Sequence, residues 1–405
     1  MHAFYDILES FLTEASEDSC HRLIKHVQQH GLSDAEIAKL TKSLAESGKK
    51  LKLKNIDSAI DIPSTGGPSS LTTLICPLFL VALGFQVPKL AVPGRPAGGI
   101  DSLSQIKGYK VQFEHENIIS ILHKSSYAHF LGTSEFAPID KYLYDYRKKH
   151  DAVNIPELAI ASLLSKKIAV GLKKIGLDIR VSSHGNFGKT ITEARDNAKR
   201  FIKVASKLGI EAICYLTNGQ TAYQPYIGRG EALLALKKTL ENSCDEWLKK
   251  HVLLCCRMAN TATGKLASSD NTYDSQKLKD IFESHLMAQG ANYQSFIDTV
   301  MEVEQTQHIK LFAETDGFVK IDLQAIRHQI VTGQNLVLTP ETPFPDPLGI
   351  TLLKNTGDFV QAKEPVALIR KKSSIPNHIL HSLYNSISVE KDENPPLFFE
   401  EVIHA

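Results

Sequence analysis

The chain has 405 residues, with 46 Lys plus Arg against 45 Asp plus Glu and a formal net charge of +1 at pH 7. This length is enough for two or three domains around a large core. The balanced charge creates no overall field for nucleic acid or an acidic membrane surface, so nucleic acid is not an expected partner. The six cysteines form no C-x-x-C pair and no metal-type spacing with histidine, so no metal site is predicted.

No targeting or membrane segment is expected. The opening Met1-His-Ala-Phe-Tyr-Asp-Ile7 lacks the basic and apolar regions of a secretion signal. The most apolar run, residues 71–85, is short and carries hydroxyl side chains, so it does not suit a bilayer span. We therefore predict a cytoplasmic protein without membrane contact.

The N-terminal part of the chain has the apolar periodicity of helices. Helices are predicted at residues 4–12, at residues 20–30 and from Ser33 onward. Ser33 and Glu36 form a capping-box pattern at the start of the third helix. The apolar run at residues 71–85 has the length of a buried helix.

The middle of the chain alternates short strands with helices. Strands are predicted at residues 88–92, 177–182 and 211–216. Between them, helices are predicted from near Asp101, at residues 155–175 with Asn154 as the cap, and from Thr190 to about residue 208. This alternation is typical of an α/β sheet.

Beyond Thr315 the residue pattern becomes typical of β-strands. Strand patterns occur at residues 317–322, 350–353 and 366–370, with several prolines in between. We predict a small β-rich C-terminal domain here. From about residue 373 the pattern assigns no element, and we treat that segment as a tail.

A glycine-rich turn, Asp61-Ile-Pro-Ser-Thr-Gly-Gly67, leads into the apolar helix. Adjacent glycines let the backbone turn tightly and expose N–H groups. Free N–H groups and the helix dipole both favour negative charge, so the turn is a candidate anion site. The alternative is an ordinary helix cap.

A second cluster contains Arg147, Ser162 and Lys166. Ser162 and Lys166 are four residues apart on one predicted helix and therefore face the same way. Two cations and a hydroxyl suit a planar, carbonyl-bearing ligand on whose oxygens negative charge develops. The alternative is an exposed lysine pair on an amphipathic helix.

The order of these motifs resembles the thymidine and pyrimidine-nucleoside phosphorylase family, including its AMP phosphorylase branch. Asp61-x-x-Ser-Thr-Gly-Gly67 is similar to the family's phosphate motif Asp-Lys-His-Ser-Thr-Gly-Gly. Leu143-Tyr-x-x-Arg147 and Ala161-Ser-x-Leu-x-Lys-Lys167 are similar to its base-binding Leu-Tyr-x-x-Arg and Ala-Ser-Ile-Leu-x-Lys-Lys, with the same interval between arginine and serine. The likeness extends over residues 30–370.

Further segments carry the same resemblance. Pro96-Ala-Gly-Gly-Ile-Asp101 is similar to the Pro-Ala-Gly-Thr-Ala-Asp loop of the AMP phosphorylase branch, and Phe136-Ala-Pro-Ile-Asp140 to its Leu-Ala-Pro-Ala-Asp. Asp178-Ile-Arg-Val-Ser-Ser183 resembles the family's Asp-Val-Lys-Val-Gly-Ser strand. His184 follows this strand, where it is either a ligand contact or a polar loop residue.

The resemblance implies the α/β fold of nucleoside phosphorylases and class II phosphoribosyltransferases. A discontinuous helical base-binding domain would comprise residues 1–57 and 141–172. A larger mixed α/β-sheet phosphate-binding domain would comprise residues 58–140 and 173–315. A small β-rich C-terminal domain at residues 316–372 and a tail at residues 373–405 would follow. Closure of the first two domains would exclude water from the substrates.

The implied activity is that of a pentosyltransferase without a cofactor. It would reversibly phosphorolyse a pyrimidine nucleoside or nucleoside monophosphate to free base and sugar 1-phosphate. The base would contact Arg147, Ser162 and Lys166, and the two cations would act catalytically by stabilising the departing pyrimidine anion. The phosphate ligands would be Ser64, Thr65, Gly66, Gly67, Thr73 and Arg95.

The phosphate side departs from the family pattern. Ile62 and Pro63 replace the Lys-His pair, and Gly99 replaces the threonine of the second loop. A charge-assisted contact contributes about 1.5–3 kcal/mol, so phosphate affinity is predicted to be weak unless Arg95 substitutes. The change Ile62→Lys with Pro63→His is then predicted to improve it.

Two alternatives to the phosphorylase stay open at this point. One is a catalytically altered or inactive relative that binds a nucleobase or nucleoside. The other is a phosphoribosyltransferase with a different second substrate. The N-terminal helical segment is also shorter than in the family, which leaves a homodimer open.

Overall fold

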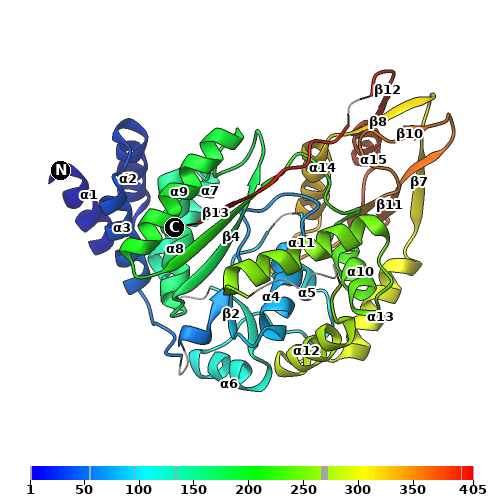
Figure 1. Cartoon of the computed structure of the whole chain (residues 1–405). Helices are drawn as coiled ribbons and strands as arrows, with labels where there is room; N and C mark the ends of the chain where they lie inside the picture. The colour runs from blue at the N-terminus through cyan, green and yellow to red at the C-terminus, as the bar shows by residue number, and fades with distance from the viewer. Residues whose placement is uncertain are drawn as a thin grey trace.

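The computed structural model describes residues 2–53, 56–94, 96–132, 135–265, 272–393 and 395–404. Short helices from the N-terminus form one end of the molecule, a mixed sheet flanked by helices forms the middle, and a β-rich part forms the other end (Figure 1). The strand of the chain nearest the C-terminus returns from the β-rich part to the central sheet (Figure 1). The α/β fold class predicted from the alternation of elements is confirmed.

The central sheet has the strand order β1-β4-β5-β13. β1, β4 and β5 are parallel, whereas β13 is antiparallel to β5. A separate parallel pair, β2 and β3, is joined to the β1 side through an isolated bridge between Ala59 and Gln86. The strands are β1 (Ile60–Asp61), β2 (Val87–Ala91), β3 (Tyr127–Leu131), β4 (Lys174–Val181), β5 (Glu211–Asn218) and β13 (Glu400–Ile403).

Two apolar cores cover opposite faces of this sheet. Side chains alternate along a strand, so Cys214 and Leu216 of β5 face one core and Tyr215 faces the other. The helices of the first core are α1 (His2–Thr13), α2 (Glu17–His30), α3 (Asp34–Glu46), α7 (Pro138–Lys149), α8 (Pro156–Ala169) and α9 (Ile191–Lys207). The helices of the second are α4 (Thr72–Ala82), α10 (Arg229–Leu240), α11 (Glu246–Thr263), α12 (Ser275–Ala288) and α13 (Tyr293–Gln305).

Local sequence signals account for several helix boundaries. Ser33 caps α3 through the predicted reciprocal capping box with Glu36. The prediction for residues 155–175 was too long, because α8 ends at Ala169 and Gly171 then adopts a φ of 74° before β4. Asn154 does not cap this helix, which begins after Ile155 without a side-chain cap.

Short elements complete this part of the fold. They are the 3₁₀ helix η1 (Ile56–Ser58), α5 (Gly99–Leu103) and α6 (His115–Ser125). The helix predicted from near Asp101 is therefore only a short one. Within the described residues, no helix is both long enough and apolar enough to cross a membrane.

The β-rich part contains two antiparallel sheets, with orders β6-β9-β11-β7 and β10-β8-β12. Its strands are β6 (Tyr226–Ile227), β7 (His308–Phe312), β8 (Gly317–Ile321), β9 (Leu348–Leu352), β10 (Phe359–Val360), β11 (Pro365–Lys371) and β12 (Ile387–Glu390). Two helices, α14 (Leu323–Leu336) and α15 (Asn377–Tyr384), pack in the same core. The segment beyond residue 373 thus supplies α15, β12 and β13.

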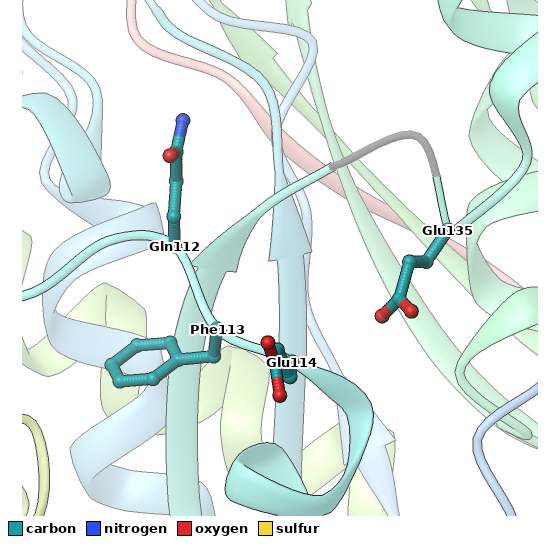
Figure 2. Close-up of a pocket in the computed structure, with 4 residues that line it drawn as sticks. All are labelled: Gln112, Phe113, Glu114 and Glu135. Atoms are coloured by element: carbon teal, nitrogen blue, oxygen red, sulfur yellow. The ribbon is translucent and has the colours of Figure 1, made fainter.

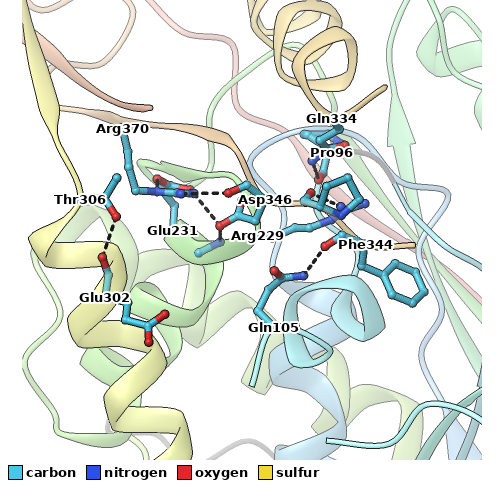
Figure 3. A network of polar contacts seen from close by, with 12 residues as sticks. Pro96, Gln105, Arg229, Glu231, Glu302, Thr306, Gln334, Phe344, Asp346 and Arg370 are labelled. Atoms are coloured by element: carbon cyan, nitrogen blue, oxygen red, sulfur yellow. Dashed lines mark hydrogen bonds and ion pairs between the residues drawn. The ribbon is translucent and has the colours of Figure 1, made fainter. Parts of the chain in front are cut away.

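A buried polar network joins the β-rich part to α10 (Figure 3). Arg370 of β11 donates from Nε to Glu231 of α10 at 2.6 Å and from Nη2 to Asp346 at 2.8 Å. Gln334 of α14 reaches the carbonyl oxygen of Pro96 in the second glycine loop at 2.6 Å. The contact of Gln334 places α14 beside the loop that follows β2.

Candidate active site

The glycine turn follows β1 and is held against β4. The N–H of Thr65 donates to the Asp178 carbonyl at 2.9 Å, and the N–H of Asp178 donates to the Pro63 carbonyl at 2.9 Å. The Ser64 hydroxyl donates to the Asp178 carboxylate at 2.9 Å. Gly66 has a φ of 90°, and no atom lies within 4 Å of the position that a Cβ would occupy there, so its backbone is open to a ligand.

The side chain of Ile62 points away from this turn, whereas a phosphate-binding cation at this position would point toward it. Its side chain is fully buried in the apolar core with Tyr215. A Cβ added at Gly176 would lie 2.8 Å from Ile62 Cγ1, which shows how closely the strand packs there. A lysine at position 62 in this orientation would bury its ammonium group, which is costly. The gain expected from Ile62→Lys with Pro63→His stays a prediction.

Thr73 lies at the start of α4 beside the second glycine loop. Its hydroxyl accepts a hydrogen bond from the N–H of Gly99 at 3.1 Å. A Cβ at Gly99 would lie 2.6 Å from the Thr73 carbonyl oxygen and 3.0 Å from His129 Cε1, so a threonine does not fit at position 99. Arg95, the predicted phosphate-binding cation of this loop, lies outside the described residues.

A buried ionic triad connects the turn to α8. Asp61 of β1 accepts from Lys89 of β2 at 2.6 Å and from Lys167 of α8 at 2.6 Å. Burial alone would raise the pKa of Asp61, but the charges of Lys167 and Lys89 hold that pKa well below its usual range. Burial lowers the pKa of Lys167, an effect that the Asp61 charge opposes. The triad fixes α8 next to the strand from which the glycine turn emerges.

Lys166 is next in sequence to Lys167 but has different partners. Its ammonium group donates to the Ser162 hydroxyl at 2.8 Å and to the Ser162 carbonyl at 2.9 Å, and it forms an ion pair with Asp140 of α7. The ammonium group also lies 5.9 Å from the centre of the Tyr144 ring. The second carboxylate oxygen of Asp140 is buried and has no partner among the described residues. A cation, a hydroxyl and a spare acceptor thus lie together.

Arg147 departs from its predicted role as a donor that faces the base. It is 2% exposed, and its Nε, Nη1 and Nη2 donate to the carbonyl oxygens of Ala152, Leu158 and Val153 at 3.1, 3.2 and 2.8 Å. Burial lowers the pKa of its guanidinium to about 10, which keeps it charged at neutral pH. Arg147 thus holds the loop between α7 and α8 against the start of α8. The conformation of this loop could not be predicted from the sequence.

Sequence reasoning missed the pairing of Asp61 with Lys89, because 28 residues separate them and no motif links them. His184, weighed as a ligand contact, is exposed in the loop after β4. Among the residues that the structure describes, no group of His, Cys, Asp and Glu could hold a metal ion.

Neither of two cavities formed by the described residues encloses the site. A cavity of about 360 Å³ is lined by Gln112, Phe113 and Glu114 on one side and Glu135 on the other (Figure 2). Its two carboxylates do not suit an anion. The cavity that borders Gly67 and the second glycine loop is only about 10 Å³, which is too small for a nucleoside.

Comparisons with known proteins agree with the resemblance seen in the motifs. The chain is 26% identical over 387 residues to a pyrimidine-nucleoside phosphorylase of Staphylococcus epidermidis, covering 92% of this chain and 88% of that protein. The pyrimidine-nucleoside phosphorylase of Bacillus subtilis gives the same identity and coverage. No family model matches the chain.

The fold is similar to that of a solved phosphoribosyltransferase. The anthranilate phosphoribosyltransferase of Saccharomyces cerevisiae superimposes with a TM-score of 0.51 at 12% identity, covering 73% of this chain and 91% of that chain. The chain is thus a distant relative of the pyrimidine-nucleoside phosphorylases with the fold predicted from its motifs.

Proposed function

We propose that the protein is a pentosyltransferase that phosphorolyses a pyrimidine nucleoside. Phosphate attacks the anomeric carbon of the sugar, the C–N bond to the base breaks, and the products are free base and sugar 1-phosphate. The observation that carries the proposal is the similarity to pyrimidine-nucleoside phosphorylases over 92% of the chain, which includes both the Lys166 cluster and the glycine turn.

On the base side, Lys166 and Ser162 are the proposed ligands. The Lys166 ammonium would stabilise the negative charge that develops on the leaving base. The spare oxygen of Asp140 would accept from an N–H of the base, since a pyrimidine offers both acceptors and donors. Arg147 remains in the proposal as a positioning residue, because its donors hold the start of α8.

On the phosphate side, the proposed ligands are the Thr65 hydroxyl and the Gly67 N–H of the turn, with the Thr73 hydroxyl from α4. Their alignment would hold phosphate in line with the bond that breaks. The Ser64 hydroxyl and the N–H groups of Thr65 and Gly66 already donate to acceptors within the protein. Residues 1–57 with 141–172 would carry the base, and residues 58–140 with 173–315 the phosphate. The helices α3 and α8 of the base-carrying part share an apolar core with α9 of the phosphate-carrying part.

The test is phosphate-dependent release of free base. The purified protein is incubated with uridine, thymidine, cytidine and their 5′-monophosphates, with and without inorganic phosphate. Free base is measured by chromatography, and sugar 1-phosphate by ³¹P NMR. We expect equal amounts of the two products, and only when phosphate is present.

Two variants serve as controls for this assay. Lys166→Met should lower kcat/KM at least about tenfold, because a charge-assisted contact contributes about 1.5–3 kcal/mol. Lys141→Met removes an exposed ion pair on α7 and should leave the rate unchanged. Binding of nucleoside without release of base in any mixture would contradict the phosphorylase and favour the inactive binder.

A further inference from the structure

Arg180 of β4 lies directly beneath the glycine turn. Its N–H donates to the Thr65 hydroxyl at 2.9 Å, and a Cβ added at Gly67 would lie 3.9 Å from Arg180 Cβ. Beyond Gly67 the chain is tied down two residues later, where the Ser69 hydroxyl donates to the Gln224 carbonyl at 2.6 Å. The turn therefore passes over this one strand position.

The guanidinium group of Arg180 is buried without a full set of partners. The residue is 3% exposed. Nη1 donates to the Thr217 hydroxyl at 3.3 Å, and the guanidinium carbon lies 4.7 Å from the centre of the Tyr223 ring. Nε and Nη2 are buried and have no hydrogen-bond partner in the part of the chain that the structure describes.

Two other buried arginines, Arg370 and Arg147, have charged or carbonyl partners. Arg370 binds two carboxylates, and three nitrogens of Arg147 bind carbonyl oxygens. An unpaired buried charge is costly, and a bound anion would compensate for it. Arg180 differs from these two arginines because two of its buried nitrogens have no partner among the described residues.

We propose that Arg180 is the cation of the phosphate site. Its Nε and Nη2 would donate to the oxygens of an anion held by the Thr65 hydroxyl and the Gly67 N–H of the turn. This inference rests on the proposed function for the identity of the anion as inorganic phosphate. It also explains how a turn with Ile62 and Pro63 binds a doubly charged ligand, since the cation comes from the neighbouring strand.

The proposal predicts a combination of effects that a purely structural arginine does not produce. Arg180→Met keeps the length of the side chain and removes the unpaired charge, so the variant should melt at or above the temperature of the parent in buffer without phosphate. Addition of inorganic phosphate should raise the melting temperature of the parent and leave that of Arg180→Met almost unchanged.

The experiment measures phosphate affinity by calorimetry and thermal shift in the parent, Arg180→Met, Arg180→Lys and Arg22→Met. Arg22 is half exposed on α2, where it pairs with Asp18, and serves as the matched control. We expect Arg180→Met to raise the Kd for phosphate at least about tenfold, Arg180→Lys to raise it less, and Arg22→Met to leave it unchanged. In turnover, KM for phosphate should rise while KM for the nucleoside stays constant.

The outcomes separate this proposal from the proposed function. If Arg180→Met or, should that variant not fold, Arg180→Lys binds phosphate as tightly as the parent, the assignment of Arg180 is overturned even when the parent releases base. If the parent binds phosphate through Arg180 but releases base from no nucleoside, the anion site stands and the phosphorylase does not. A parent that neither binds phosphate nor shows a KM for it contradicts both.

Discussion

At the scale of single residues, neighbouring side chains of the same type have different chemistry. Lys166 and Lys167 are adjacent, but successive residues of a helix point about 100° apart. Lys167 is therefore enclosed with Asp61, whereas Lys166 reaches Ser162 and Asp140. The exposed fraction of the Lys166 side chain is 13%, against 3% for Lys167, and this difference identifies the lysine that a ligand can contact.

Arg147→Met is predicted to affect stability more than Lys166→Met does. The change removes three hydrogen bonds from a charged donor and leaves buried carbonyl oxygens unpaired. The free energy of unfolding should fall by about 2–5 kcal/mol, as measured by urea denaturation. Arg147→Lys should not restore it, since an ammonium group cannot span three separate acceptors.

Lys166→Met is the comparison, because it removes a single charged partner. It leaves the buried Asp140 carboxylate without its cation, so the free energy of unfolding should also fall, by about 1–3 kcal/mol, while base release falls. A variant Arg147→Met with the unfolding free energy of the parent and no base binding would show that Arg147 contacts the base directly, contrary to the positioning role.

At the scale of secondary-structure elements, β13 gives the central sheet its last strand. It pairs antiparallel with β5 from Glu400 opposite Thr217 to Ile403 opposite Cys214. The chain just before it accepts hydrogen bonds from Tyr223 and Asn218, through the carbonyl oxygens of residues 399 and 397. The strand thus covers an edge of β5 that would otherwise present unpaired backbone groups.

Truncation after residue 394 is predicted to destabilise the central sheet. Amide hydrogens of β5 that pair with β13 should exchange faster with solvent, and the protein should aggregate more readily through the exposed edge. Hydrogen exchange read by mass spectrometry on peptides spanning β5 measures the effect. Leu397→Ser is the control, because that side chain is 68% exposed and the backbone pairing is retained. Unchanged exchange in the truncated protein would contradict the edge role of β13.

At the scale of the whole molecule, a buried histidine cluster links β3 to α12. His285 Nδ1 donates to the Tyr127 carbonyl at 3.0 Å, and its Nε2 then accepts from the Tyr109 hydroxyl at 2.9 Å. The Tyr127 hydroxyl meets His129 Nδ1 at 2.9 Å. Burial lowers the pKa of His285 to about 3 and that of His129 well below its usual value, so both are neutral in the folded protein.

Stability is therefore predicted to fall as the pH is lowered from about 6.5. In this range the unfolded chain binds protons on these histidines and the folded chain does not, so protonation favours unfolding. Each such histidine contributes up to about 1.4 kcal/mol per pH unit until its folded pKa is reached. Asp61 has a lowered pKa and adds to the loss only below about pH 4, where its unfolded form becomes protonated.

The measurement is the unfolding free energy from urea titrations between pH 7 and 4.5. His285→Gln should flatten the dependence on pH by about one histidine, whatever its effect on stability at pH 7. His184→Gln, in an exposed loop, is the control and should leave the slope unchanged. A slope that is identical in the parent and His285→Gln would show that His285 is not held neutral.

The sequence alone determined the features that depend on neighbours along the chain. Ser33 and Glu36 are three residues apart, so their capping box is a local property of the first turn of α3. The adjacency of Ser162 and Lys166 follows from helical spacing in the same way. The turn at Gly66 and Gly67 could be predicted because glycine tolerates positive φ. The order of the motifs indicated the fold through the resemblance to pyrimidine-nucleoside phosphorylases.

The tertiary structure alone decided which charged groups have partners. Asp61 and Lys167 are 106 residues apart, and the turn meets Arg180 through a contact between residues separated by 115 positions. β13 pairs with β5 because that edge of the sheet was open. No local pattern at residues 400–403 indicates this pairing. Burial and hydrogen bonding depend on the three-dimensional neighbours of a side chain, and so the roles of Arg147 and Arg180 became apparent only in the folded chain.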